Sequence, residues 1–83
     1  MKQIVFDIEA NGLNPDKVWC IIAYERGAKE YITWSGDDLV CFKDWIKEQG
    51  ELEIIGHNII GYDIPVLEQL LNVDFSKCTV TDT

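Results

Sequence analysis

The chain has few of the basic residues that most nucleic-acid-binding surfaces use. Of its 83 residues, fifteen are acidic and seven are basic, which gives a formal net charge of −8, and Arg26 is the only arginine. Proteins that bind the phosphates of nucleic acids generally gather lysine and arginine on one surface. The composition therefore argues against a general nucleic-acid surface. It leaves open a site where carboxylates hold metal ions, because the ions then supply the positive charge.

Cysteine pairs and long apolar runs are also missing. Cys20, Cys41 and Cys78 are odd in number, widely spaced and without a CxxC pair, so neither a disulfide framework nor a zinc site is expected. No apolar run approaches the roughly 20 residues that cross a membrane, and residues 1–10 do not resemble a secretory signal. We therefore expect no contact with membranes, a cytoplasmic location, and cysteines that pack as small apolar side chains.

The residues that are present suffice for one modest hydrophobic core. Hydrophobic residues make up 47% of the chain, which is too much for a disordered protein, and its length permits a single domain over residues 1–83. No internal repeat or linker-like segment divides it. The chain is expected to form one globular domain.

Three strands are expected in the first half of the chain. Residues 3–8 form a mostly apolar run that ends in turn-forming residues. Residues 17–25 and 29–34 are rich in β-branched and aromatic side chains and are separated by the turn sequence RGA. These patterns predict an antiparallel meander of three strands.

The second half is expected to alternate helices with strands. Apolar residues at helical spacing predict a helix from Ser35 or Asp37 to Gly50, and a second helix over 63–71, with Pro65 in its first turn. Short apolar strands are expected at 52–58 and from Cys78 onward. Helical crossovers place such strands parallel to the first one. The expected fold class is α/β, with a mixed five-stranded sheet (antiparallel meander, then parallel strands) and flanking helices.

Asp7 and Glu9 lie at the end of the first apolar strand and point to the same face, because side chains alternate along a strand. If strand 52–58 pairs beside the first strand, Asp63 reaches the same rim. Clustered carboxylates of this kind suit Mg²⁺ or Mn²⁺, and two such ions can activate water against a phosphodiester. Other readings stay open: the two strand acids can mark a wet strand face, and Asp63 can cap its helix.

Two segments resemble the motifs of a known family. FDIEANGL, beginning at Phe6, resembles the first motif of the DEDD 3′–5′ exonucleases, and HNIIGYDIPVL, beginning at His57, resembles the second. The resemblance is strongest to the N-terminal proofreading domain of family A replicative DNA polymerases of phages, and it spans nearly the whole chain. It implies a ribonuclease H-like fold, a magnesium-dependent exonuclease, and a setting in a bacterial or phage-infected cell.

The resemblance also implies roles for single residues. The implied ligands of two Mg²⁺ or Mn²⁺ ions, which are also the implied catalytic residues, are Asp7, Glu9 and Asp63. The residues implied to contact the single-stranded DNA 3′ end are Asn11, Gly12, Leu13, Asn58 and Tyr62. Leu13 would wedge between the last two bases, although it also fits as an edge of the core. His57 is expected to be a hydrogen-bonded residue at a strand end, and Asp82 to cap a following helix.

The resemblance stops before the third motif of the family, a His or Tyr followed by Asp, which is absent from the sequence. That motif supplies a general base and the fourth ligand, so we expect a C-terminally truncated, partial exonuclease domain with little activity alone. The rest of a polymerase chain, a complementing C-terminal fragment or self-association would then complete it. The alternative function is a non-catalytic remnant that acts as an acidic protein-binding or regulatory module.

Overall fold

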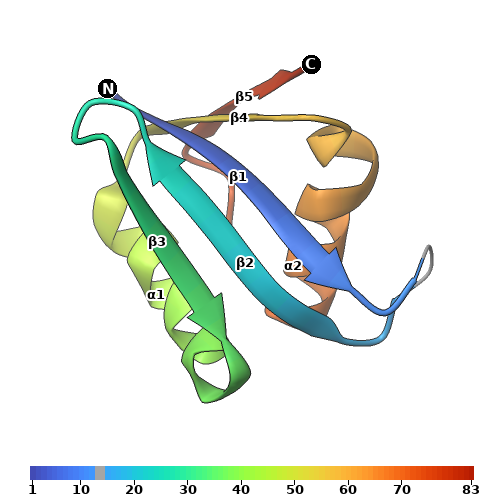
Figure 1. Cartoon of the computed structure of the whole chain (residues 1–83). Helices are drawn as coiled ribbons and strands as arrows, with labels where there is room; N and C mark the ends of the chain where they lie inside the picture. Colours follow the sequence, from blue (N-terminus) through green and yellow to red (C-terminus); the bar gives the residue numbers. More distant parts are fainter. Residues whose placement is uncertain (13–14) are drawn as a thin grey trace.

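The chain forms a five-stranded sheet with two α-helices and two shorter helical segments, as the computed structural model describes it for residues 1–12 and 15–83 (Figure 1). The strands and helices, in chain order, are β1 (Lys2–Ala10), β2 (Val18–Glu25), β3 (Glu30–Ser35), η1 (Gly36–Asp38), α1 (Leu39–Gln49), β4 (Leu52–Gly56), η2 (Ile59–Asp63), α2 (Ile64–Leu70) and β5 (Cys78–Asp82). All five strands and both main helices match segments predicted from the sequence.

The sheet has the strand order β3-β2-β1-β4-β5, with β1 in the centre. β1 pairs antiparallel with β2, and β2 pairs antiparallel with β3, which confirms the meander. β4 runs parallel to β1, and β5 runs parallel to β4. The expected α/β class, a ribonuclease H-like mixed sheet, is confirmed. Because β1 is central, its two acids do not lie on an edge strand.

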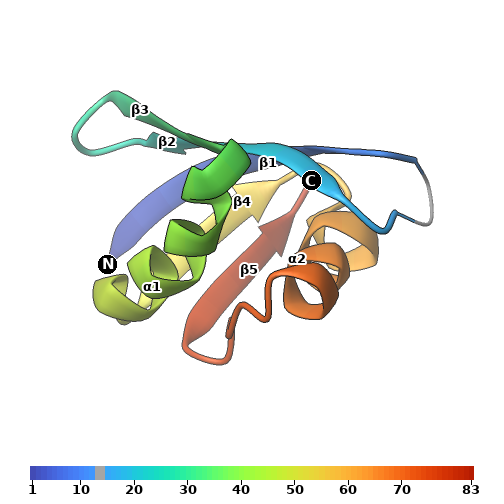
Figure 2. The ribbon, with the colours of Figure 1, turned by 90° about the horizontal axis from the view of Figure 1, so that it is seen from below.

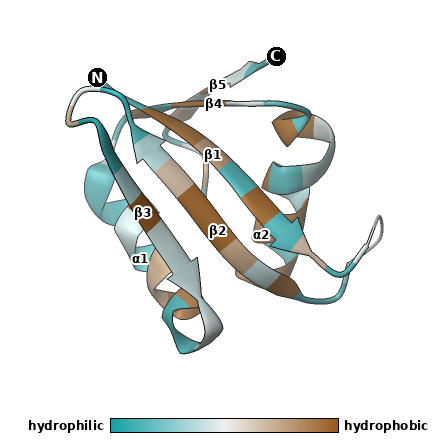
Figure 3. Ribbon diagram, viewed as in Figure 1, coloured by the Kyte–Doolittle hydropathy of each residue, from teal (hydrophilic) through white to brown (hydrophobic). Residues whose placement is uncertain are grey.

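One hydrophobic core lies between the sheet and both helices. Figure 2 shows α1 and α2 on the same side of the sheet, so the opposite face carries neither helix. The alternation of apolar and polar residues along β1 matches this arrangement, since Ile4, Phe6 and Ile8 are buried while Asp7 and Glu9 are exposed. The same alternation is visible along the C-terminal half of β1 in Figure 3.

α1 buries the residues that its helical spacing selects. Phe42 and Ile46 are buried, and Phe42 meets the Trp34 ring edge-on at a centroid distance of 4.8 Å. The helix ends at Gly50, whose φ of 70° favours glycine. Ser35, one of the two residues at which the sequence placed the start of this helix, makes no capping hydrogen bond to the short helical turn η1. In the described part of the chain, no helix is both long enough and apolar enough to span a membrane.

The junction between β4 and α2 is a single π-helical turn, η2, which the sequence did not predict. The N–H of Ile64 donates to the carbonyl of Ile59, five residues earlier, as a π turn requires. Gly56 permits the close approach of η2 to the sheet, because a Cβ at this position would lie 2.4 Å from Cγ2 of Ile59. Pro65 fits the first turn of α2, where its missing N–H needs no partner.

Candidate functional site

The candidate site lies where β1 extends beyond its parallel neighbour. β4 pairs with β1 only from Lys2 to Val5, whereas β2 pairs with β1 as far as Ala10. The last half of β1 therefore has no strand paired to it on the side of β4. η2 covers this edge and brings Asp63 beside it. Such a position, at the carboxyl ends of parallel strands where the connections change direction, is a common place for ligands.

Asp63 is the one charged side chain that is buried among the described residues, with 4% of its surface exposed. Its Oδ2 atom is buried and has no hydrogen-bond partner. Burial, followed by the charge of Asp7 and then that of Asp82, raises the pKa of Asp63 from 3.8 to about 6, although hydrogen bonds from the backbone N–H groups of Ile8 and Asp63 itself act in the opposite direction. A buried carboxylate without a cation or donor on one oxygen is costly, so this atom suits a positively charged ligand.

Asp7 and Glu9 lie on the face of the sheet that carries neither helix. Both side chains are exposed, and in the described part of the chain neither makes a hydrogen bond or ion pair with another side chain. Asp7 is close enough to Asp63 to raise its pKa, whereas Glu9 has no such effect on Asp63. The charges of Asp7 and Asp63 therefore interact.

No three Asp, Glu, His or Cys side chains within residues 1–12 and 15–83 lie close enough to hold one metal ion in this conformation. The predicted site of Asp7, Glu9 and Asp63 stays a prediction.

Asp82 lies beside the candidate site. The sequence predicted that it would cap a following helix, and this prediction is wrong. Its carboxylate accepts hydrogen bonds from the backbone N–H groups of Asn58 (2.8 Å) and Ile60 (3.0 Å), so it caps η2, an earlier element, and not a following helix. The next residue, Thr83, donates its N–H to the carbonyl of Gly56 at 2.8 Å. The end of β5 thus holds the turn that carries Asp63.

Asn11 and Gly12 belong to the loop after β1. The side-chain oxygen of Asn11 accepts hydrogen bonds from the N–H groups of Asp16 (3.1 Å) and Lys17 (3.0 Å), and its amide donates to the Asp16 carboxylate. The side chain of Asn11 therefore stabilises its own loop. The predicted wedge, Leu13, lies outside the described residues.

Tyr62 joins this loop to η2. Its ring packs against the core, and its hydroxyl group donates a hydrogen bond to the carbonyl of Gly12. Tyr62 thus fixes the distance between the first and second motifs, which lie fifty residues apart in the sequence. Its position beside Gly12 agrees with the predicted location of both residues on one rim.

Asn58 and His57 follow β4 at the same end of the sheet. Asn58 adopts a left-handed conformation with φ of 55°, and its side chain lies against Gly61, where a Cβ would be 2.8 Å from the Asn58 Oδ1 atom. His57 Nδ1 lies 3.1 Å from the carbonyl oxygen of Thr83. His57 is therefore a hydrogen-bonded residue at a strand end, as expected.

Trp19 was not predicted to contribute to the site. A bulge in the β1–β2 ladder pairs Glu9 with Cys20 and Ala10 with Val18, which leaves Trp19 as an extra residue next to the end of β1. Trp19 is 52% exposed, and Lys17 Nζ lies 4.4 Å from the centre of its ring. The burial of both Val18 and Ile21 reflects this bulge, whereas the sequence from Val18 to Ala23 is apolar throughout and gives no signal of it.

No protein-family model and no curated protein sequence matches the chain. Among solved structures, the chain resembles the family B DNA polymerase from the hyperthermophilic archaeon Pyrobaculum calidifontis, with a TM-score of 0.65 and 20% sequence identity. The likeness covers 92% of this chain and 12% of that polymerase. At this identity it shows a shared fold: the chain has the fold of a small part of a family B DNA polymerase.

Proposed function

We propose that the chain is a metal-dependent 3′–5′ exonuclease module associated with a DNA polymerase, acting on a single-stranded DNA 3′ end. The observation that carries the proposal is the buried Asp63 carboxylate, whose Oδ2 atom has no hydrogen-bond partner among the described residues and whose pKa is raised by burial and by the charge of Asp7. The shared fold with part of a DNA polymerase supports it. The exonuclease activity and the likeness to phage family A enzymes depend on the two motifs that resemble those of DEDD exonucleases.

The residues that would hold divalent cations are Asp7, Glu9 and Asp63, all of them oxygen ligands that suit Mg²⁺ or Mn²⁺. The donor set fits, because a cation would offset both the burial of the Asp63 carboxylate, which is the main reason that its pKa is raised, and the charge of Asp7 beside it. Bound ions would supply an activated water and stabilise the leaving oxygen of a phosphodiester. The protein contributes a rigid strand, β1, for two of these ligands and the turn η2 for the third.

The substrate end would lie along the rim that Tyr62 forms with Gly12. A Cβ built at Gly12 would meet no atom within 4 Å, so the backbone there lies open to a sugar at close range. Asn58 offers an amide side chain at the same end of the sheet. The exposed ring of Trp19 is a further surface on which a base can stack.

Hydrolysis by residues 1–83 alone is expected to be slow. The sequence contains no counterpart of the third motif, and loss of a general base typically lowers rates about 10²- to 10⁴-fold. We therefore propose metal binding as the property of this chain, and full activity as a property of a completed domain.

The experiment is a Mn²⁺ titration by calorimetry, followed by digestion of single-stranded DNA. The chain is compared with the double variant Asp7→Ala, Glu9→Ala and with Asp63→Asn. Asp44→Ala with Glu48→Ala is the matched control, because it removes two exposed acids from α1, far from the site in sequence. Mn²⁺ binding by the chain and the control, lost in both site variants, is the expected result.

Failure of the intact chain to bind Mn²⁺ would refute the metal site and favour the acidic regulatory module. Equal binding by all four proteins would show that general acidity, and not this site, attracts the ion. Digestion of DNA with metal would show that residues 1–83 retain activity, and its loss in the site variants would assign it to these carboxylates.

A further inference from the structure

A second hollow lies at the opposite end of the sheet from the candidate site. It opens between α1 and the connection from α2 to β5, and three lysines line it: Lys43, Lys47 and Lys77. Its apolar floor includes Ile46 and Cys78. The hollow includes Cys78, the first residue of β5, whereas the acids of the candidate site lie toward the C-terminal ends of the parallel strands. We refer to this site as the basic hollow.

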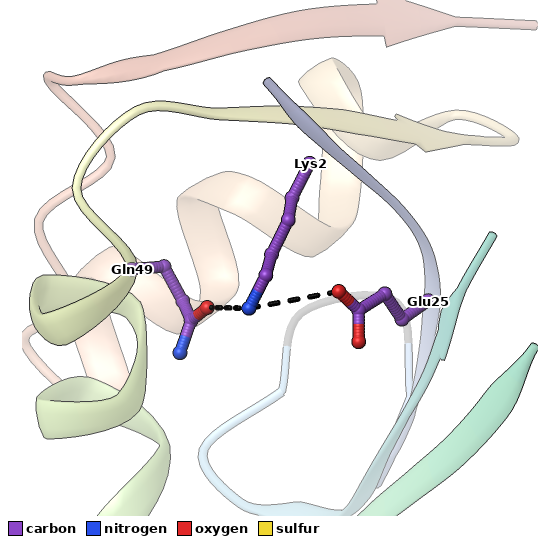
Figure 4. Close-up of polar contacts among 3 residues, drawn as sticks. All are labelled: Lys2, Glu25 and Gln49. Carbon is purple, nitrogen blue, oxygen red and sulfur yellow. Dashed lines mark hydrogen bonds and ion pairs between the residues drawn. The ribbon is translucent and has the colours of Figure 1, made fainter. Parts of the chain in front are cut away.

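The charge of the basic hollow is unusual for this chain. Three of the seven basic side chains gather here, although the chain carries fifteen acids. In the part of the chain that the structure describes, the one ion pair within 4.0 Å joins Lys2 to Glu25, at 3.5 Å. Figure 4 shows Lys2 between its two partners, because its ammonium group also donates to Gln49 at 2.8 Å. Within residues 1–12 and 15–83, Lys43, Lys47 and Lys77 form no ion pair within 4.0 Å.

The charges of α1 include two like-charged pairs at i,i+4 spacing and one opposite pair, Asp44 and Lys47, at i,i+3 spacing. Lys43 and Lys47 lie four residues apart and repel each other, and so do Asp44 and Glu48. Alternating the signs at this spacing would stabilise the helix by a few tenths of a kcal/mol for each pair. Lys47 gains something from its place in the last turn, but Lys43 lies too far from the helix end for this effect. Because Lys43 and Lys47 lie four residues apart, they share one side of α1, and both line the hollow.

Asp74 is the one acid among the residues that line the basic hollow. Its carboxylate accepts a hydrogen bond from the N–H of Ser76 at 2.9 Å, which is the main reason that its pKa is lowered, while Lys77 and Lys47 contribute by their charge. The three lysines and one aspartate give the lining of the hollow a formal net charge of two positive charges. A phosphomonoester carries about −1.5 to −2 at neutral pH, which matches this balance.

We propose that the basic hollow binds a phosphomonoester group attached to an apolar or aromatic body, either a free nucleoside monophosphate or the 5′-phosphate end of a nucleic-acid strand. Its volume of about 340 Å³ lies within the range of small-ligand pockets. Lysine ammonium groups hold phosphate as point charges, and the apolar floor at Ile46 and Cys78 accepts the attached group. The site is distinct from the carboxylates of β1 and needs no metal ion.

The test is an NMR titration of the uniformly ¹⁵N-labelled chain with AMP, in the presence of EDTA so that the metal site plays no part. Inorganic phosphate and adenosine are titrated separately as the two halves of the probe. The variant Lys43→Gln, Lys47→Gln is compared with Arg26→Gln, Lys29→Gln, which removes the same charge from the β2–β3 turn. Loss of two charge-assisted contacts should weaken AMP binding about tenfold or more, with little change in the control.

Saturable shifts at Gly50, Lys77 and Cys78 with AMP, a weaker response to phosphate, and none to adenosine would support the proposal. Equal weakening in both variants, shifts scattered over other lysines, or no saturable response would overturn it. A trinucleotide with and without a 5′-phosphate distinguishes the sources. Tighter binding of the phosphorylated strand than of AMP assigns the site to a nucleic-acid end, and the reverse assigns it to a free nucleotide.

Discussion

Asp63 should make the metal-free chain less stable as the pH rises from about 4 to about 6. Burial, with Asp7 second, raises its pKa from 3.8 to about 6 in the folded chain, whereas an unfolded chain titrates near the lower value. Because the folded state holds the proton more tightly, the loss of stability starts near the unfolded pKa and is complete above the folded one. A rise of about two pKa units, at about 1.4 kcal/mol each, sets this loss at up to about 3 kcal/mol.

The assay is urea unfolding with EDTA at about pH 4 and about pH 7.5, followed by tryptophan fluorescence. Asp63→Asn should match the wild type within about 1 kcal/mol at the lower pH and exceed it by about 2 to 3 kcal/mol at the higher. Asp44→Asn, which removes an exposed charge from α1, is the control for the overall repulsion of the acidic chain. Mn²⁺ should restore the stability of the wild type only. Parallel pH profiles of the wild type and Asp63→Asn would refute the reasoning.

Three further substitutions test the supports of the site. Gly56→Ala places a Cβ 2.4 Å from Cγ2 of Ile59 and should cost about 1–3 kcal/mol in urea unfolding, whereas Gly27→Ala, with no atom within 4 Å, should cost little; equal costs would contradict the close approach of η2. Asp82→Ala removes the cap of η2 and should cost about 0.5–2 kcal/mol, with faster hydrogen exchange at the start of η2; unchanged exchange would count against the cap. Leu67→Ala empties a fully buried position in α2 and should cost about 2–5 kcal/mol; a loss under about 1 kcal/mol would mean that α2 is not anchored there.

The strands and helices were predictable where one local pattern determines burial. Phe42 and Ile46 repeat at helical spacing and are buried in α1, and the alternation along β1 places its acids on one face. The π turn η2 was not predictable, because it depends on the close packing of Gly56 against Ile59, a contact between elements that no periodicity records.

The candidate site was predictable only in the part that depends on strand order. Parallel strands that end at one rim predicted Asp63 near Asp7, and the charge of Asp7 acts on the Asp63 carboxylate, while the metal site itself stays a prediction. Asp82 was expected to cap a following helix because capping is read from neighbours in the sequence, yet its partner Asn58 lies 24 residues earlier. The convergence with Glu9 depends on exposed rotamers, which neither the pattern nor the fold fixes.

The hold of β5 on η2 has a consequence for the order in which the chain assembles. The meander of β1, β2 and β3 forms from contacts between neighbours in sequence, whereas the parallel pairing of β4 with β1 closes a loop of some fifty residues. Asp63 reaches its place only when β4 has joined β1, and η2 is capped only when Asp82 of β5 has joined β4. The turn that carries Asp63 is therefore expected to be fixed last, so that a half-folded chain, with its meander already formed, lacks the buried carboxylate of the candidate site.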